Sequence, residues 1–203
     1  MRLDALARYL QDVANDDATE ALGDDSMAWV VRRTAVRVEQ FPVFREPLTL
    51  TTWASGIGSR WAERRTSVEG ANGGHIEAVS LWVHVDLRSG RPQKLVPSFL
   101  AAYGEAAGGR EVKARLSHGD VAPNAARTPW TPRFADFDVV GHVNNAIYWA
   151  MVEEYVDLAA PVTVELEFRG GVDRGQHVEV ARSGDALWVL ADGAVAASAH
   201  VTA

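Results

Sequence analysis

The stretch Asp136–Tyr155, DFDVVGHVNNAIYWAMVEEY, crowds chemically capable side chains into a few residues. The carboxylate of Asp138 could activate a water molecule or attack a carbonyl carbon. His142, four residues later, could orient that carbonyl or transfer protons near neutral pH. Gly141 allows a tight turn and the close approach of a substrate. These residues run into an apolar, helix-like pattern, so they stand where a helix begins.

The start of that helix supplies backbone donors. We expect the N–H groups of Val143, Asn144 and Asn145 to be free at the positive end of the helix dipole, where they would bind a developing oxyanion. Tyr148 lies one turn further and is a candidate for substrate contact. Glu153 lies about three turns beyond His142, ~16 Å along the axis. It is therefore a catalytic candidate only if it faces an opposite half of the molecule.

Each of these residues also has a structural reading. Asp136 or Asp138 can cap the helix, and His142 can be a satisfied structural group. The two asparagines can close a turn through their side chains, Tyr148 can be core or pocket wall, and Glu153 can belong to a solvated helix end. The other histidines show no metal-ligand spacing, so we predict no metal or cofactor and read them as surface or sheet residues: His75, His84, His118, His177 and His200.

Composition narrows the class of protein. The chain has 203 residues, 47% of them hydrophobic, a formal net charge of −7 and no cysteine. The absence of cysteine excludes disulfides and thiolate catalysis and fits a reducing compartment, so we expect a cytoplasmic protein. The acidic balance argues against nucleic-acid binding. No apolar run approaches the ~20 residues that span a bilayer, so we expect no membrane insertion.

The predicted helices and strands occur in the same order in both halves of the chain. Residues 3–15 predict an amphipathic helix, NDDATEALGDDS a loop, and the segments up to about 87 a series of alternating strands. After a polar linker, RTPWTPRFADFD predicts a strand, VNNAIYWAMVEEYVDL a helix, and the rest further strands. We therefore predict an N-terminal unit at 1–104, a linker at 105–126 and a C-terminal unit at 127–203 that carries the motif. The first unit lacks a leading strand, either through loss or through truncation of the chain start.

The segment DFDVVGHVNNAIYWAMVEE resembles the D-x-D-x-x-G-H-V-N-N-x-x-Y motif of hotdog-fold thioesterases. The duplication, together with SLWVHVDLRSGRPQKL and VELEFRGG, is similar to the acyl-ACP thioesterase family of double hotdogs. The resemblance covers nearly the whole chain. It implies an α+β fold, a tandem hotdog in which two curved antiparallel sheets each pack on a central helix. It also implies a catalytic Asp and His, which Asp138 and His142 match. The family's Asn falls on Val140, and its Glu after the LEFR-like strand falls on Gly171.

The resemblance implies hydrolysis of fatty acyl thioesters in lipid metabolism, with acyl-ACP as the expected substrate and acyl-CoA as an alternative. The two missing polar residues leave open a catalytically impaired acyl-binding protein. A hotdog dehydratase or hydratase would need a motif that we do not find. An acidic carrier protein could dock on Arg60, Arg64 and Arg65, and exposed sheet edges could form a homodimer.

Overall fold

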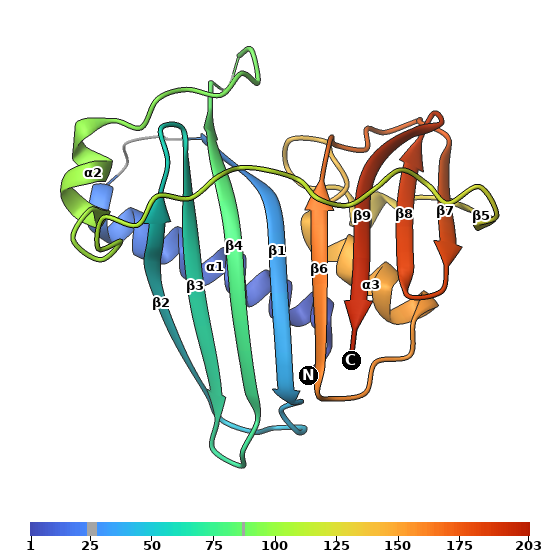
Figure 1. Cartoon of the computed structure of the whole chain (residues 1–203), viewed down its shortest axis with the longest axis horizontal. Helices are drawn as coiled ribbons and strands as arrows, with labels where there is room; N and C mark the ends of the chain where they lie inside the picture. Colours follow the sequence, from blue (N-terminus) through green and yellow to red (C-terminus); the bar gives the residue numbers. More distant parts are fainter. Residues whose placement is uncertain (24–27, 87) are drawn as a thin grey trace.

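The computed structural model describes residues 1–23, 28–86 and 88–203. Nine strands form one antiparallel sheet in the order β2-β3-β4-β1-β6-β9-β8-β7-β5. Two long helices lie on one face of this sheet, and an extended segment crosses the other face (Figure 1). The predicted α+β double hotdog is confirmed, and the two expected sheets are joined edge to edge into one.

The N-terminal half consists of helix α1 (Leu3–Leu22) and strands β1 (Ala28–Gln40), β2 (Leu48–Ile57), β3 (Trp61–Gly70) and β4 (His75–Val85). The first part of α1 buries Leu3, Leu6 and Leu10 at helical spacing. The helix then continues to Leu22, through most of the segment 15–26 that we expected to be a loop, and residues 24–26 of that segment lie outside the described part of the chain. Alanine and glutamate favour helix there, and the chain leaves the helix only at Gly23, which has a φ of 68°.

The C-terminal half contains strand β5 (Ala126–Trp130), a short 3-10 helix (Phe134–Asp136) and helix α3 (Asn145–Tyr155). Strands β6 (Val162–Phe168), β7 (Val178–Ser183), β8 (Ala186–Ala191) and β9 (Ala194–Thr202) complete it. The strand expected to run to Asp138 therefore ends at Trp130, because Pro132 follows and lacks an N–H for a ladder. The segment between β5 and α3 is left as the loop that carries the motif.

The two halves share one core. Strand β1 pairs with β6 in an antiparallel register from Arg33↔Glu167 to Val38↔Val162. The largest cluster of buried side chains includes residues of both helices, such as Leu6 of α1 and Val152 of α3. The motif loop is thus held against a frame to which both halves contribute.

The linker is attached to the sheet, although its small and polar residues predicted little core of its own. It follows helix α2 (Pro97–Tyr103), which falls in the predicted N-terminal unit, and it crosses the face opposite the long helices (Figure 1). Glu167 of β6 is fully buried and accepts hydrogen bonds from the backbone N–H groups of Ser117 and His118. The indole of Trp188 donates to the carbonyl of Gly119. Buried polar contacts therefore hold the linker in place.

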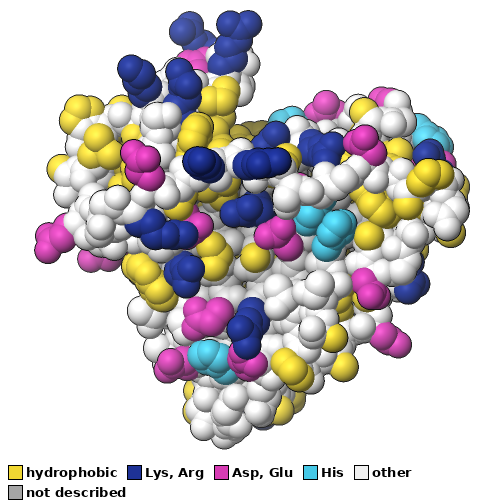
Figure 2. All heavy atoms as spheres, in the orientation of Figure 1, with side chains coloured by type: hydrophobic (Ala, Val, Ile, Leu, Met, Phe, Trp, Pro, Cys, Tyr) yellow, Lys and Arg dark blue, Asp and Glu magenta, His cyan; other side chains and the backbone are white. Residues whose placement is uncertain are grey.

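Lysine and arginine side chains gather at the upper end of the N-terminal half on the face shown in Figure 2. The carboxylates are spread more evenly over the same face. Across the described residues, no helix has both the length and the apolar character that a membrane span requires.

Candidate active site

The motif forms a tight loop between the 3-10 helix and α3. Asp138 donates its N–H to the carbonyl of His142 at 2.8 Å and accepts the N–H of Gly141 on its own carbonyl at 3.2 Å. Gly141 has a φ of 91°, a conformation that residues with a side chain rarely adopt. The loop conformation therefore depends on the glycine that the motif supplies.

The two oxygens of the Asp138 carboxylate differ in their hydrogen bonds to this loop. Oδ1 accepts from the N–H groups of Val140 at 3.0 Å and His142 at 3.1 Å. Within the described part of the chain, no hydrogen bond uses Oδ2. The two N–H donors hold the carboxylate in one orientation, and its second oxygen remains able to accept a proton. This arrangement suits a general base or a nucleophile.

Tyr148 lies in the core beneath this loop. Its side chain is buried and its ring meets Phe168 edge-on, with centroids 5.4 Å apart. Burial raises the pKa of Tyr148, and the charge of Asp138 adds to the effect. The phenol therefore stays protonated, and its burial agrees with a place in the core.

Two of the three expected oxyanion donors are already used. The N–H of Val143 donates to the carbonyl of Val172 at 2.9 Å, and the N–H of Asn144 donates to the carbonyl of Asp136 at 2.8 Å. We had expected both to be free, but Asn144 is the N-cap, so Val143 and Asn144 precede the helix and join neighbouring loops. No hydrogen bond of the described residues uses the N–H of Asn145, the first residue of α3. Asn144 caps the helix through its side chain, which accepts from Ala146 at 2.9 Å.

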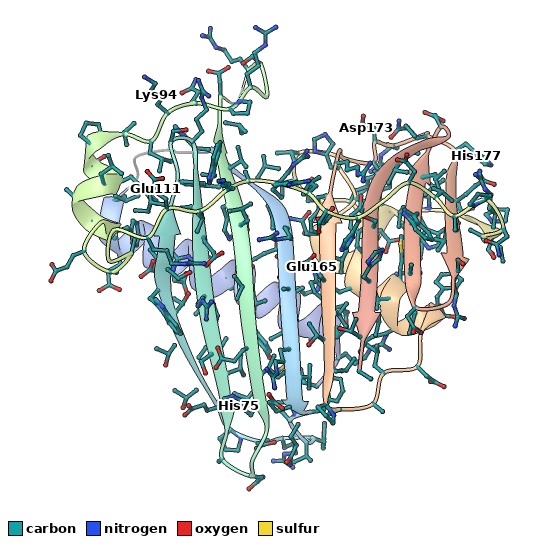
Figure 3. The ribbon with its side chains drawn as sticks, in the orientation of Figure 1. His75, Lys94, Glu111, Glu165, Asp173 and His177 are labelled. Carbon is teal, nitrogen blue, oxygen red and sulfur yellow. The ribbon has the colours of Figure 1, made fainter. Side chains whose placement is uncertain are left out.

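His142 lies exposed beside the loop that follows β6. Its Nε2 is 3.2 Å from Oδ1 of Asp173, and the two side chains are 51% and 64% exposed. Figure 3 labels Asp173 in this loop. Gly171 lies directly against the imidazole, because a Cβ built there would be 3.1 Å from Cγ of His142. The position where the resemblance implies a Glu thus faces His142, and Asp173 supplies a carboxylate two residues later.

Asp173 is a functional candidate that reasoning from the sequence missed. The resemblance pointed to Gly171 alone, and the loop RGGVDRG has no periodicity that would place a side chain. The isolated bridge between His142 and Asp173 shows that the two loops run side by side. An acidic residue within a few positions of the expected one was the signal that could have found it.

Glu153 and Asp136 make contacts that stabilise neighbouring segments of the fold. Glu153 accepts the N–H of Leu3 at 3.0 Å and lies 3.2 Å from Arg2, so it caps the start of α1. It faces the opposite half, as its distance along the helix required, but it lies about 12 Å along α3 from Asn145. Asp136 is buried. Burial acts to raise its pKa, but the hydrogen bonds and charge of Arg133 hold that pKa below its ordinary value.

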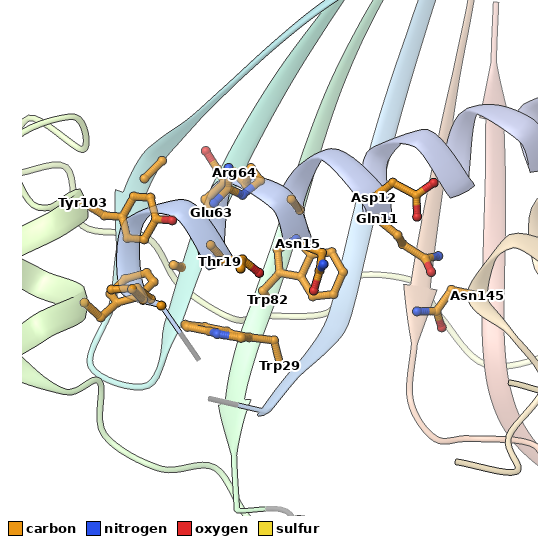
Figure 4. A pocket seen from close by; sticks show the side chains of 17 residues that line it. Gln11, Asp12, Asn15, Thr19, Trp29, Glu63, Arg64, Trp82, Tyr103 and Asn145 are labelled. Atoms are coloured by element: carbon orange, nitrogen blue, oxygen red, sulfur yellow. The ribbon is translucent and has the colours of Figure 1, made fainter. Parts of the chain in front are cut away.

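A cleft of about 600 Å³ opens between the second half of α1 and strands β2–β4, as Figure 4 shows. We call it the α1 cleft. Its walls include the aromatic side chains of Trp29, Trp82, Phe99 and Tyr103, and Asn145 lines it from the motif. The first residue of α3, whose N–H is unpaired within the described chain, therefore joins the motif loop to the cleft. A cleft of this size can hold a small-molecule ligand.

Arg64 lies inside this cleft rather than on a docking surface. Its side chain, 13% exposed, pairs with Asp17 of α1 at 2.6 Å. The strand places Arg64 toward the helices, whereas Arg60 and Arg65 are exposed. Of the three arginines that we named for carrier-protein docking, only those two remain available.

Among the residues that the structure describes, one group of side chains could hold a metal ion, and it lies on the opposite face of the sheet. Ligand atoms of His118, Glu165 and Glu167 lie within 4.8 Å of one another. The Glu167 oxygens already accept N–H groups of the linker, and His118 contacts both Glu165 at 3.2 Å and Ser198 at 2.9 Å. His118 is thus buried rather than a surface residue. We interpret this set of side chains as a structural attachment that holds the linker to the sheet.

Known proteins resemble this chain in sequence. The chain is 29% identical over 185 residues to an uncharacterized protein of Mycobacterium tuberculosis, covering 89% of this chain and 74% of that protein. It is 30% identical over 138 residues to the chloroplastic dodecanoyl-[acyl-carrier-protein] hydrolase of Umbellularia californica, covering 64% of this chain and 36% of that protein.

Solved structures share the fold. The 12:0-ACP thioesterase from Umbellularia californica superposes with a TM-score of 0.79 at 24% identity, covering 99% of this chain and 89% of that chain. An acyl-ACP thioesterase from Bacteroides thetaiotaomicron gives a TM-score of 0.78 at 18% identity, covering 99% and 89%. The model of the acyl-ACP thioesterase N-terminal domain matches residues 1–103, and that of the C-terminal domain matches residues 121–196. The two models together cover both sheet-and-helix units, and the chain belongs to the acyl-ACP thioesterase family.

Proposed function

We propose that this protein hydrolyses fatty acyl thioesters of acyl carrier protein and releases the free fatty acid. The observation that carries the proposal is the Asp138 carboxylate, which the loop holds by one oxygen and leaves unbonded at the other. The family and the α1 cleft support it, since a thioester hydrolase needs a base or nucleophile, an oxyanion donor and room for the acyl chain.

The proposed reaction begins at the thioester carbonyl. Asp138 takes a proton from a water molecule through its free oxygen, and the water oxygen bonds to the carbonyl carbon. The negative charge that forms on the carbonyl oxygen is stabilised by the N–H of Asn145 at the positive end of α3. The same carboxylate could instead attack the carbonyl directly and form an anhydride that water then cleaves.

The second half of the reaction expels the thiol. The carbon–sulfur bond breaks, the carbonyl re-forms, and the departing sulfur receives the proton. We assign this transfer to His142, whose imidazole takes the proton from Asp138 and passes it to the departing sulfur. The imidazole is exposed on the same loop, and Asp173 orients it, with Oδ1 3.2 Å from Nε2. Asp173 acts here as a positioning residue, in place of the Glu that the resemblance implies at Gly171.

A second function has one observation in its favour. Val140, 68% exposed, stands where the resemblance implies an amide, and valine cannot hold a water molecule. An acyl-binding protein with little turnover would fit that substitution.

The test is a panel of thioesters of varied chain length on acyl carrier protein and on CoA, with free thiol and free acid both measured. Multiple turnover on the carrier-protein thioesters supports the proposal, and faster turnover on CoA corrects the substrate. Retention of the acyl group without thiol release overturns the proposal in favour of a binding protein.

A further inference from the structure

Large apolar side chains lie exposed beside the catalytic loop. Phe134 is 81% exposed, Val139 is fully exposed, and Val140 is 68% exposed. The two valines directly follow Asp138 in the chain, and the N–H of Val140 donates to the Asp138 carboxylate at 3.0 Å. Single exposed apolar residues are common on protein surfaces, but a group of them bordered by polar side chains is typical of an interaction site.

Two arginines border these apolar side chains. The guanidinium of Arg174 lies over the rings of Phe134 and Phe137, at 5.0 and 4.7 Å from their centroids. Among the described residues, no carboxylate forms an ion pair with Arg174, so its charge is open to a partner. The side chain of Arg133 is 79% exposed, although it pairs with the buried Asp136. This surface therefore fits a partner that presents apolar side chains next to carboxylates.

The exposed apolar side chains and the unpaired arginine lie next to both catalytic candidates. We call this group the motif rim, and it consists of Phe134, Val139, Val140 and Arg174. Val140 contacts Asp138 through its N–H, as described above. Arg174 directly follows Asp173, whose carboxylate lies 3.2 Å from the imidazole of His142. A thioester must reach Asp138 to be hydrolysed, so a protein that carries the thioester has to approach the surface next to this loop.

We propose that the motif rim is the surface on which the acyl carrier protein docks, with apolar contacts to Phe134 and Val139 and an ion pair between a carrier carboxylate and Arg174. This inference rests on the proposed thioesterase function and identifies where its protein partner binds. Docking removes the apolar side chains of the rim from water. The charge of Arg174 steers the encounter, because charges at the edge of an interface raise the association rate. A pantetheine thioester has no protein surface to cover the rim and gains nothing from it.

The experiment compares an acyl-ACP with the pantetheine thioester of the same acyl group, which brings the same carbonyl without the carrier protein. Phe134→Ser and Val139→Ser should each lower kcat/KM for acyl-ACP by about three- to tenfold, while kcat/KM for the pantetheine thioester stays unchanged and shows that the variants are folded. Arg174→Gln should lower kcat/KM for acyl-ACP at low salt and weaken its dependence on salt. Equal losses on both substrates would overturn the inference, because the side chains would then contact the pantetheine arm or the catalytic groups.

Two matched controls test whether the position of the rim matters. Phe44→Ser removes a side chain that is 92% exposed in the turn between β1 and β2. This turn lies at the lower end of the sheet, whereas Asp173 beside the motif lies at the upper end (Figures 1 and 3). Arg60→Gln removes an exposed arginine between β2 and β3. Both controls should keep the wild-type kcat/KM for acyl-ACP, and a loss in either that equals the losses in the rim variants would overturn the assignment.

A binding measurement separates the docking surface from the proposed function. If the wild-type protein cleaves no thioester, the proposed function fails, but calorimetry with acyl-ACP still tests the rim. Binding that is weakened in Phe134→Ser would support the docking surface, and equal binding by the variant and the wild-type protein would refute it.

Two further measurements test other occupants of the rim. Light scattering measures whether the chain forms a dimer, and co-sedimentation measures its binding to vesicles of anionic phospholipid. A dimer or a vesicle complex that Phe134→Ser abolishes would overturn the inference, because the rim would then bind a second copy of the chain or a lipid surface. A monomer that stays unbound to vesicles would support it.

Discussion

The two hydrogen bonds to one oxygen of Asp138 allow its structural and chemical roles to be separated. In Asp138→Asn the amide oxygen can still accept the N–H groups of Val140 and His142, which the native Oδ1 accepts at 3.0 and 3.1 Å. In Asp138→Ala both N–H groups lose their acceptor. The loop should therefore keep its conformation in the first variant and lose it in the second.

The size of the effect follows from these contacts. A hydrogen bond to a charged group contributes about 1.5–3 kcal/mol. Both N–H groups lie in an exposed part of the loop, where water can replace part of the lost interaction. We expect Asp138→Ala to lose about 1–3 kcal/mol in the free energy of unfolding. For a chain of this size that corresponds to a fall in Tm of about 2–12 °C, and we expect Asp138→Asn to lose less than about half as much.

Thermal unfolding followed by circular dichroism measures both variants against the wild-type protein. Equal losses in Asn and Ala variants would show that the charge, rather than an acceptor at the Oδ1 position, holds the loop. No loss in either variant would refute the structural role of the carboxylate altogether.

Three further predictions concern the stability of the fold. Glu153→Ala should cost about 1 kcal/mol of unfolding free energy through loss of the α1 cap, while thiol release changes less than about threefold; a loss of activity at unchanged stability would restore Glu153 as a catalytic residue. Gly141→Ala should destabilise by about 1–2 kcal/mol because of its positive φ, as chemical denaturation would measure. Stability should also fall on acidification. Burial, then the charge of His118, lowers the pKa of His200, and a hydrogen bond from His118 lowers that of Glu165.

The signs of these two shifts agree. The folded state binds a proton on His200 less readily than the unfolded state does, so stability falls as pH drops below the unfolded histidine value of about 6.5. The contribution of Glu165 is complete above its unfolded value of about 4.3 and is lost as pH falls through the lower folded value. The Tm should therefore fall between about pH 7 and pH 4, and His200→Gln should flatten the upper part of that fall. A Tm that is constant over this range would contradict both assignments.

Gly119→Ala is the control for Gly141→Ala, because its φ is not positive and a Cβ there meets nothing within 4 Å. It should leave stability unchanged. An equal loss in both variants would mean that the positive φ of Gly141 is not the cause.

The sequence was informative where periodicity or the motif fixed the local structure. The alternating strands, the helix after the motif and the family resemblance all led to the observed double hotdog. The second half of α1 was missed because its sheet-facing side lines a cleft and so lacks an apolar stripe. The contacts made by loops also could not be predicted from the sequence. Whether the N–H groups of Val143 and Asn144 are free depends on which loops lie beside them, and no spacing in the sequence encodes that.

Asp173 illustrates the same limit at the site. The contact between His142 and Asp173 joins loops about thirty residues apart in the chain. This contact is a consequence of tertiary packing, which is why the residue types alone pointed to Gly171.

The most direct test of the central claim is thiol release from acyl-ACP by the wild-type protein and by Asp138→Asn at equal concentration, with both shown to be folded. We predict multiple turnover by the wild-type protein and a decrease of about 10²–10⁴-fold in the variant, because the amide cannot take the proton from water. Equal rates in the two proteins would contradict the assignment of Asp138 as the catalytic group.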